Sequence, residues 1–285
     1  MIYIRGIMKH TETSKKVKDG KTIYYQSWLP DKKLSAILIV VHGLGEHSSR
    51  YGTHFVEFYI KENIGVISFD LPGHGKSYGK KGHIDDPVLL LEIIDDVIKN
   101  TKYEYPNLPL FIYGHSFGGE ISLWYTLVRR PDVNGVILTS PLIGPKVAVP
   151  PMKMLLAKTM EKLLPSFSLN NGLEPEKLSR DPEIVNQYIS DPFVHPLVSA
   201  KTGMMIINRG KWIMENAHFN TNDILLMVGG KEEIVNLEVI DQFYKKAPYV
   251  TYKIWQNLYH EIHNEPEKQE VFIYTLKWIK EHLNS

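Results

Sequence analysis

Short apolar runs rich in β-branched residues recur along the first half of the chain. They occupy residues 36–41, 66–69, 110–113 and 136–139, and turn residues bound each of them. Continuous apolar runs of this length are typical of parallel strands that are buried on both faces. Residues 22–29 alternate apolar and polar side chains instead, which predicts an antiparallel strand at the edge of the sheet.

Helical patterns separate these strands. The clearest spans residues 88–98, where Asp86 can cap the helix and Pro87 can occupy its first position. Further strand patterns follow at residues 224–228 and 251–255. The other helical patterns of the core lie at residues 119–129, 237–246 and 267–283. Strands and helices in alternation predict an α/β fold with a mostly parallel central sheet flanked by helices.

Residues 141–218 interrupt this alternation. They contain several prolines, amphipathic helical segments and no strand pattern. We therefore expect a helical cap, inserted between two strands of a core that comprises residues 1–140 and 219–285. One helical pattern in the cap, at residues 151–164, gathers apolar side chains on one face. These side chains are Met152, Leu155, Leu156, Met160, Leu163 and Leu164. That face either packs on the core or lines an acyl tunnel and contacts a membrane surface, and the sequence favours neither.

The composition excludes several classes of protein. The chain of 285 residues contains no cysteine, which excludes disulfides, thiolate nucleophiles and cysteine-bound metals. The net charge is +1 and no long run of one sign occurs, which argues against a nucleic-acid partner. Residues 1–20 lack the apolar run of a signal peptide, and no window reaches the roughly 18 apolar residues of a transmembrane helix. These features predict a cytoplasmic protein.

A sharp turn is predicted at residues 114–118, whose sequence Gly-His-Ser-Phe-Gly matches the pattern G-x-S-x-G. The pattern directly follows one predicted strand and directly precedes a helical pattern. Glycines two positions on either side of the serine relieve the crowding of a tight strand-to-helix turn, on which the hydroxyl is exposed. This context favours Ser116 as a nucleophile over a chance glycine-rich turn.

A serine nucleophile needs a base, and the base needs an acid that orients it. In the fold that carries this turn, the acid and then the histidine follow the serine in the sequence. His260 lies on the loop between the last strand and the last helix, and His263 is its competitor. The loop after strand 224–228 offers Glu232 as the acid, with Glu233 as the alternative.

Two backbone N–H groups are expected to hold the oxyanion that forms during acyl transfer. One belongs to Phe117, the residue after the nucleophile. The other comes from the glycine-rich loop 42–47, where Leu44 is the predicted donor.

No cofactor or metal site is predicted. Residues 75–77 are similar to the end of a phosphate-binding loop, but Asp70 stands where that loop needs a glycine. His260 and His263 are three residues apart, whereas the zinc-protease helix places its histidines four apart.

Four separated motifs extend over almost the whole chain, at residues 42–51, 70–77, 114–118 and 259–265. The first, HGLGEHSSRY, is much more selective than G-x-S-x-G. Together they resemble the monoacylglycerol lipase and lysophospholipase branch of the α/β-hydrolases. The resemblance implies hydrolysis of a fatty-acyl glycerol or lysophospholipid beneath a helical cap.

The resemblance also implies roles for single residues. The family's nucleophile and base match Ser116 and His260, and its oxyanion donors match Leu44 and Phe117. The position of its acid matches Glu232, where the family usually has aspartate. Glutamate is one methylene longer and can still hold an imidazole.

The leading prediction is a serine esterase or lipase that cleaves monoacylglycerols into glycerol and fatty acid. A lysophospholipase or a general carboxylesterase would use the same residues, and an acyltransferase or a peptidase is a more distant alternative. A non-catalytic binding module would require a broken triad, whereas all three positions hold competent groups. The expected partner is a lipid ester, with a peripheral membrane contact through the cap; the sequence does not indicate the oligomeric state.

Overall fold

The computed structural model describes residues 8–17, 20–147 and 150–283. The expectation that residues 1–20 hold no signal peptide therefore falls partly outside the described residues.

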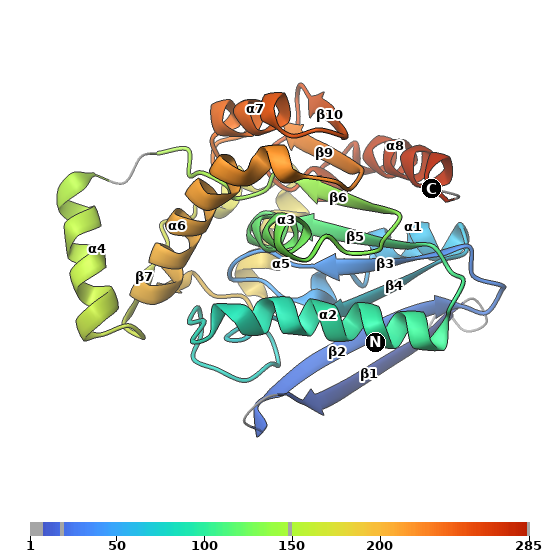
Figure 1. Ribbon diagram of the computed structural model, residues 1–285, viewed down its shortest axis with the longest axis horizontal. Helices are drawn as coiled ribbons and strands as arrows, with labels where there is room; N and C mark the ends of the chain where they lie inside the picture. Colours follow the sequence, from blue (N-terminus) through green and yellow to red (C-terminus); the bar gives the residue numbers. More distant parts are fainter. Residues whose placement is uncertain (1–7, 18–19, 148–149, 284–285) are drawn as a thin grey trace.

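Eight strands form one sheet in the order β1-β2-β4-β3-β5-β6-β9-β10 (Figure 1). The strands are β1 (Met8–Lys16), β2 (Thr22–Pro30), β3 (Ala36–Val41), β4 (Ile64–Phe69), β5 (Leu110–His115), β6 (Gly135–Thr139), β9 (Ile224–Gly229) and β10 (Val250–Trp255). The six strands from β4 to β10 are parallel, as predicted.

The apolar runs form strands because the sheet is covered on both faces. All six residues of β3 are fully buried. Ile37, Ile39 and Val41 belong to the core on one face of the sheet. Leu38 and Val40, which alternate with them, belong to the core on the other face. A side-chain period of two in a doubly covered strand leaves no position for a polar residue.

The expected edge strand is antiparallel but does not lie at the edge. β2 pairs antiparallel with β4 on one side and with β1 on the other, so β1 is the edge strand. Six consecutive side chains of β1, from Thr11 to Lys16, are exposed to solvent. Because most of this strand is exposed and polar, it carries no apolar pattern, which is why the sequence did not reveal it.

The helices of the core divide between the two faces. Side chains of α1 (His54–Lys61) and α8 (Lys268–Glu281) join one core, and those of α2 (Pro87–Glu104), α3 (Phe117–Arg129) and α7 (Leu237–Lys246) join the other. The predicted start of α2 is confirmed, since the Asp86 side chain accepts a hydrogen bond from the Val88 N–H and Pro87 follows the cap.

The chain leaves the sheet after β6 and returns at β9. This insertion holds α4 (Pro151–Leu163), η3 (Pro175–Lys177), α5 (Pro182–Ser190), α6 (Ala200–Asn216) and η4 (Ala217–Phe219). The prediction that it contains no strand is wrong, because β7 (Ser168–Asn170) and β8 (Leu197–Ser199) pair antiparallel. Three residues are too few to form a readable pattern. α6 packs on α3 of the core, and α4 lies at one end of the molecule (Figure 1).

Within the described residues, every helix is too short or too polar to cross a bilayer.

Candidate active site

The predicted strand-to-helix turn is present, and its backbone is strained. Ser116 is the single residue between β5 and α3, with φ 52° and ψ −116°. A positive φ is uncommon for a residue with a side chain and persists only where the surroundings hold it. A Cβ at Gly118 would lie 2.1 Å from the carbonyl oxygen of Val41, and one at Gly114 would lie 2.5 Å from Ser122 Oγ. The two glycines of the pattern are therefore required by close packing on both sides.

The loop after β3 lies against this turn. A Cβ at Gly43 would stand 3.4 Å from Ser116 Cβ, so the backbone of the loop passes beside the serine. Leu44 lines the same cavity as Ser116. Phe117 is the first residue of α3, and first-turn N–H groups have no partner within their own helix. The backbone N–H groups of Leu44 and Phe117 thus belong to segments that adjoin Ser116. Their role as oxyanion donors stays a prediction.

His260 and Glu232 form a buried pair. The distance from His260 Nδ1 to Glu232 Oε2 is 2.8 Å, and the carboxylate is fully buried. Glu232 Oε1 accepts hydrogen bonds from the N–H groups of Ile234 at 2.7 Å and Val235 at 3.3 Å. The Ser140 hydroxyl donates to the carbonyl oxygen of His260 at 2.9 Å, which anchors the histidine loop. The Glu232 carboxylate thus accepts three hydrogen bonds, from the imidazole of His260 and from the N–H groups of Ile234 and Val235, and these bonds fix its orientation toward the imidazole.

The alternatives from the sequence lie elsewhere. Glu233 Oε2 is 3.5 Å from Lys177 Nζ, and the Glu233 side chain is 58% exposed. His263 lies in the short helix η5 (Ile262–Asn264), where its ring stacks on Tyr51 with the centroids 5.3 Å apart. Burial lowers the pKa of His263 to about 3. Of the candidates, the structure brings Glu232 and His260 together and leaves Glu233 and His263 outside the pair.

A buried ion cluster beside the site escaped the sequence analysis. Arg50 in η2 (Ser48–Tyr51) contacts Glu46 Oε2 at 2.5 Å, and its two terminal nitrogens donate to both oxygens of Glu261 at 2.7 and 2.9 Å. Although burial opposes the charged carboxylate, Arg50 holds the pKa of Glu261 below its ordinary value. The cluster ties the loop after β3 to the residue after His260. Its only signal in the sequence was Glu46 and Arg50 spaced four apart in the first family motif.

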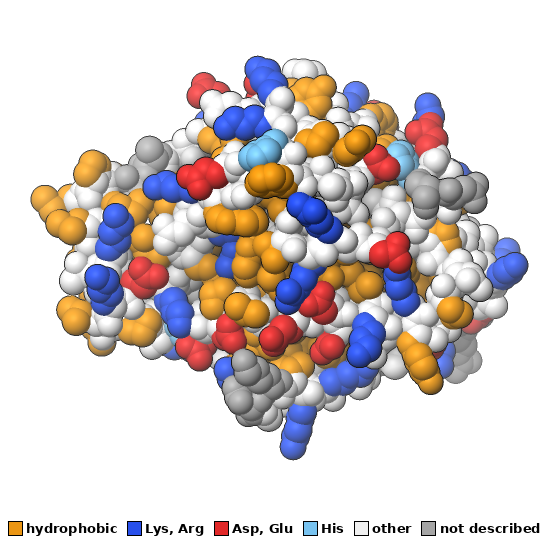
Figure 2. Space-filling view, viewed as in Figure 1, with side chains coloured by type: hydrophobic (Ala, Val, Ile, Leu, Met, Phe, Trp, Pro, Cys, Tyr) orange, Lys and Arg blue, Asp and Glu red, His pale blue; other side chains and the backbone are white. Residues whose placement is uncertain are grey.

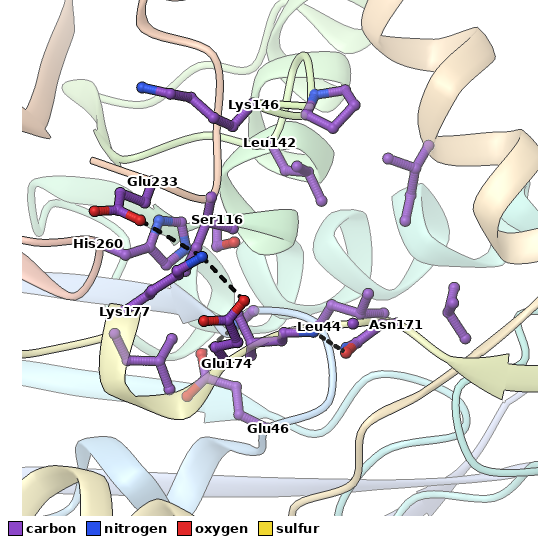
Figure 3. Close-up of a pocket in the computed structure, with 18 of the residues that line it drawn as sticks. Leu44, Glu46, Ser116, Leu142, Lys146, Asn171, Glu174, Lys177, Glu233 and His260 are labelled. Carbon is purple, nitrogen blue, oxygen red and sulfur yellow. Dashed lines mark hydrogen bonds and ion pairs between the residues drawn. The ribbon is translucent and has the colours of Figure 1, made fainter. Parts of the chain in front are cut away.

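Ser116 and His260 both line one cavity of about 460 Å³ (Figure 3). Its lining includes the apolar residues Leu44, Leu142 and Ile206, and it also includes charged side chains. The cavity lies between the core and the insertion, since α6 and η3 both contribute to the lining. Among the described residues, no group of three or more metal-binding side chains is placed to hold an ion. A hydroxyl and an imidazole in one cavity, with the imidazole held by a buried carboxylate, suit nucleophilic attack on an acyl group.

The surroundings of His260 predict the pH dependence of activity. Burial lowers its pKa, but the charge of Glu232 and the hydrogen bond to it outweigh burial and raise the pKa above 6.5. Because a general base must be neutral, activity is lost as the pH falls through this raised value. We expect the acid limb of kcat/KM for p-nitrophenyl butyrate to lie above pH 6.5, and to move to lower pH in Glu232→Gln. A wild-type limb at or below pH 6.5 would contradict this assignment.

Comparison with known proteins agrees with this geometry. Residues 32–267 match the family model described as serine aminopeptidase, S33. An uncharacterized abhydrolase domain-containing protein of Dictyostelium discoideum is 34% identical over 94% of this chain, which spans 28% of that relative. A monoacylglycerol lipase of Mycolicibacterium smegmatis is 29% identical over 93% of this chain and 95% of its own length. The crystal structure of Paleococcus ferrophilus monoacylglycerol lipase is 33% identical and covers 91% of this chain and 99% of its own, with a TM-score of 0.82.

These similarities confirm the predicted α/β-hydrolase fold and the resemblance drawn from the four motifs. The family model covers most of the chain and includes Ser116, Glu232 and His260. The chain therefore belongs to the serine aminopeptidase S33 family of α/β-hydrolases, in the branch that is similar to the monoacylglycerol lipases.

Proposed function

We propose that this protein hydrolyses the ester bond of monoacylglycerols and releases glycerol and a fatty acid. The observation that carries the proposal is Ser116, which stands on a strained turn and lines the same cavity as His260, whose imidazole is paired with the buried Glu232. The similarity to monoacylglycerol lipases supports the choice of substrate.

The reaction passes through an acyl-enzyme. Ser116 Oγ attacks the ester carbonyl while His260 takes its proton, and the N–H groups of Leu44 and Phe117 hold the oxyanion. The intermediate collapses, and His260 gives the proton to the departing glycerol oxygen. Water then attacks the acyl-enzyme with His260 again as the base, and the fatty acid leaves. Glu232 stays ionised and stabilises the imidazolium, because its hydrogen bonds and the charge of His260 outweigh burial and lower its pKa.

A hydrolysis panel tests the proposed function. Purified protein is assayed beside Ser116→Ala on monoacylglycerols of several chain lengths, matched lysophosphatidylcholines, p-nitrophenyl esters and an aminoacyl amide. We expect the highest kcat/KM for a monoacylglycerol. Activity confined to lysophosphatidylcholine would keep the mechanism and change the substrate. The absence of Ser116-dependent turnover on every substrate would refute the proposal.

We also propose that residues 141–218 act as a cap over the cavity and that α4 contacts the membrane in which the substrate lies. None of the described α4 side chains is buried, and Met152, Leu155, Leu156 and Leu163 are between 59% and 79% exposed. Figure 2 shows apolar side chains and lysines gathered at the end of the molecule that α4 forms. Large apolar side chains exposed on one helix suit insertion into a lipid surface rather than packing on the core.

Replacement of Leu155 or Leu163 by glutamine is expected to weaken binding to anionic vesicles about tenfold, since each loses apolar area that lipid would bury. Hydrolysis of p-nitrophenyl butyrate in solution should remain at the wild-type level. Ile273→Gln is the matched control, because Ile273 is 59% exposed on α8, remote from α4. Vesicle co-sedimentation measures the effect. Equal losses in the α4 and α8 variants would contradict a specific role for α4.

A further inference from the structure

We propose that Glu174, Lys177 and Glu233 form the wall of the cavity that receives the alcohol part of the substrate, and that their charges select an uncharged glycerol over a phosphorylated one. The inference rests on the proposed ester hydrolysis at Ser116. It gives a role to Glu233, which the buried pair leaves unused, and it names the headgroup class that this site accepts.

The three side chains form one ion cluster, which we call the charged wall, at the border between core and insertion. Lys177, the last residue of η3, places Nζ 3.0 Å from Glu174 Oε1 and 3.5 Å from Glu233 Oε2. Glu233 directly follows Glu232 in the loop after β9. In Figure 3 the charged wall lies on the same side of the cavity as His260. A substrate group bound there is next to the atoms that break the ester bond.

The rest of the cavity suits a hydrocarbon chain. Its lining includes the apolar residues Leu44, Leu142, Pro145, Val198, Ile206 and Ile207. In Figure 3, Lys177 and Glu233 lie to the left of Ser116, Leu44 and Leu142 lie to its right, and Glu174 lies between Lys177 and Leu44. An ester with one apolar and one polar end binds such a cavity in one orientation, because a charged wall that is covered by hydrocarbon loses its hydration without compensation. The acyl chain therefore lies along the apolar side and the alcohol faces the charged wall.

The charges of the wall decide which alcohol it accepts. One ammonium and two carboxylates sum to −1, and the hydrogen bond that Lys177 donates to Glu174 raises the pKa of Lys177, which keeps the ammonium charged. Lys177 engages one oxygen of each carboxylate, and the side chains of Glu174 and Glu233 are 65% and 58% exposed. Glycerol hydroxyls can donate to these carboxylates and accept from the ammonium without adding charge. A phosphate monoester brings a charge of about −1.5 to −2 beside a wall that is already negative.

The neighbouring charged groups do not reverse this balance. Glu46 and Glu261 also line the cavity, and Arg50 is paired with both. The second lysine in the lining, Lys146, donates to the carbonyl oxygen of Glu232 at 3.1 Å. The lining thus contains four glutamates and two lysines. With Arg50 included, these groups sum to −1, so an anionic headgroup meets a net negative charge.

The test compares octanoylglycerol with octanoylglycerol 3-phosphate, both as monomers in solution so that no lipid surface contributes. The two substrates share the acyl chain and the ester and differ in the phosphate. The measured quantity is the ratio of their kcat/KM values in the wild type, in the double variant Glu174→Gln/Glu233→Gln and in Lys177→Met. Glu176→Gln is the control, because Glu176 lies in the same short helix as Lys177, is exposed and does not line the cavity. Fluorophosphonate labelling of Ser116 and the thermal midpoint verify that each variant is folded.

The wild type should prefer octanoylglycerol by about 100-fold or more, since like charges that face each other weaken binding strongly. The double variant should reduce this preference about tenfold, and Lys177→Met should increase it about tenfold. The preference should also fall as salt is added. The control should keep the wild-type ratio.

Three results would overturn the inference and leave the hydrolase function intact. The ratio of kcat/KM values could shift in the same direction in both variants, it could stay unchanged in both, or the wild type could turn over both substrates equally. The absence of Ser116-dependent octanoylglycerol hydrolysis would overturn the proposed function, and this inference with it.

Discussion

Ser116→Ala is expected to lower kcat by at least about 10⁴-fold on every ester, because loss of the nucleophile leaves only binding and the oxyanion donors. The fold should persist. The hydrogen bonds that hold residue 116 use its backbone: its N–H donates to the Thr139 carbonyl, and its carbonyl accepts from Glu120 and Leu142, at 2.9 to 3.0 Å. Alanine preserves all three. We expect the thermal midpoint to change by no more than about 3 °C, as for a side chain with little part in stability.

The matched control for this change is Ser122→Ala. Ser122 is also buried on α3, and its hydroxyl has no hydrogen-bond partner among the described residues. Loss of this hydroxyl should leave turnover of p-nitrophenyl butyrate and labelling by a fluorophosphonate at the wild-type level. Retention of more than about 1% of activity in Ser116→Ala, with labelling intact, would mean that another residue is the nucleophile.

Glu232→Gln is expected to lower kcat by about 10³- to 10⁴-fold, comparable to loss of the acid in other triads. A glutamine amide has no charge to stabilise the imidazolium, and its NH₂ group can face Nδ1 and favour the wrong tautomer. The side chain is fully buried, so water cannot replace the lost charge. Steady-state kinetics on p-nitrophenyl butyrate measures the loss.

Glu233→Gln separates the acid from its neighbour. Glu233 contacts Lys177 and is 58% exposed, and the pair with His260 does not include it. Because p-nitrophenyl butyrate has no glycerol to contact the charged wall, its turnover in Glu233→Gln should fall less than about tenfold. If Glu233→Gln instead lost about 10³-fold while Glu232→Gln kept most activity, the acid would be Glu233.

The core of the fold was predictable where burial imposes a pattern on the sequence. β3 had to be a continuous apolar run, because helices cover both faces of the sheet at that strand. The N-terminus of α2 was predictable because its capping bond joins Asp86 to the N–H only two residues further on. β1 was not predictable, since most of its residues are exposed and polar and it carries no apolar pattern; its pairing with β2 is seen only in the structure.

In the site, too, the features that depend on neighbouring residues were predictable, and those that join distant residues were not. The strained turn at Ser116 needs small residues at Gly114 and Gly118, and the pattern G-x-S-x-G contains both of them within five consecutive residues. The contact between Arg50 and Glu261 joins residues 211 positions apart. Nothing near either residue in the sequence specifies the other, so the ion cluster beside His260 became visible only in the structure.

By itself the sequence determined the class of fold, the parallel strands of the central sheet, the turn that carries Ser116 and the loop that carries His260. Each of these follows from residues that lie close together in the chain. The tertiary structure alone decided that Glu232 rather than Glu233 meets His260, and that the apolar face of α4 is exposed. Neighbouring residues of a loop point in different directions, and packing between β9 and β10 sets which one reaches the histidine. Whether a helix face is buried likewise depends on the part of the protein that packs against it, and the residues of the helix alone do not specify that part.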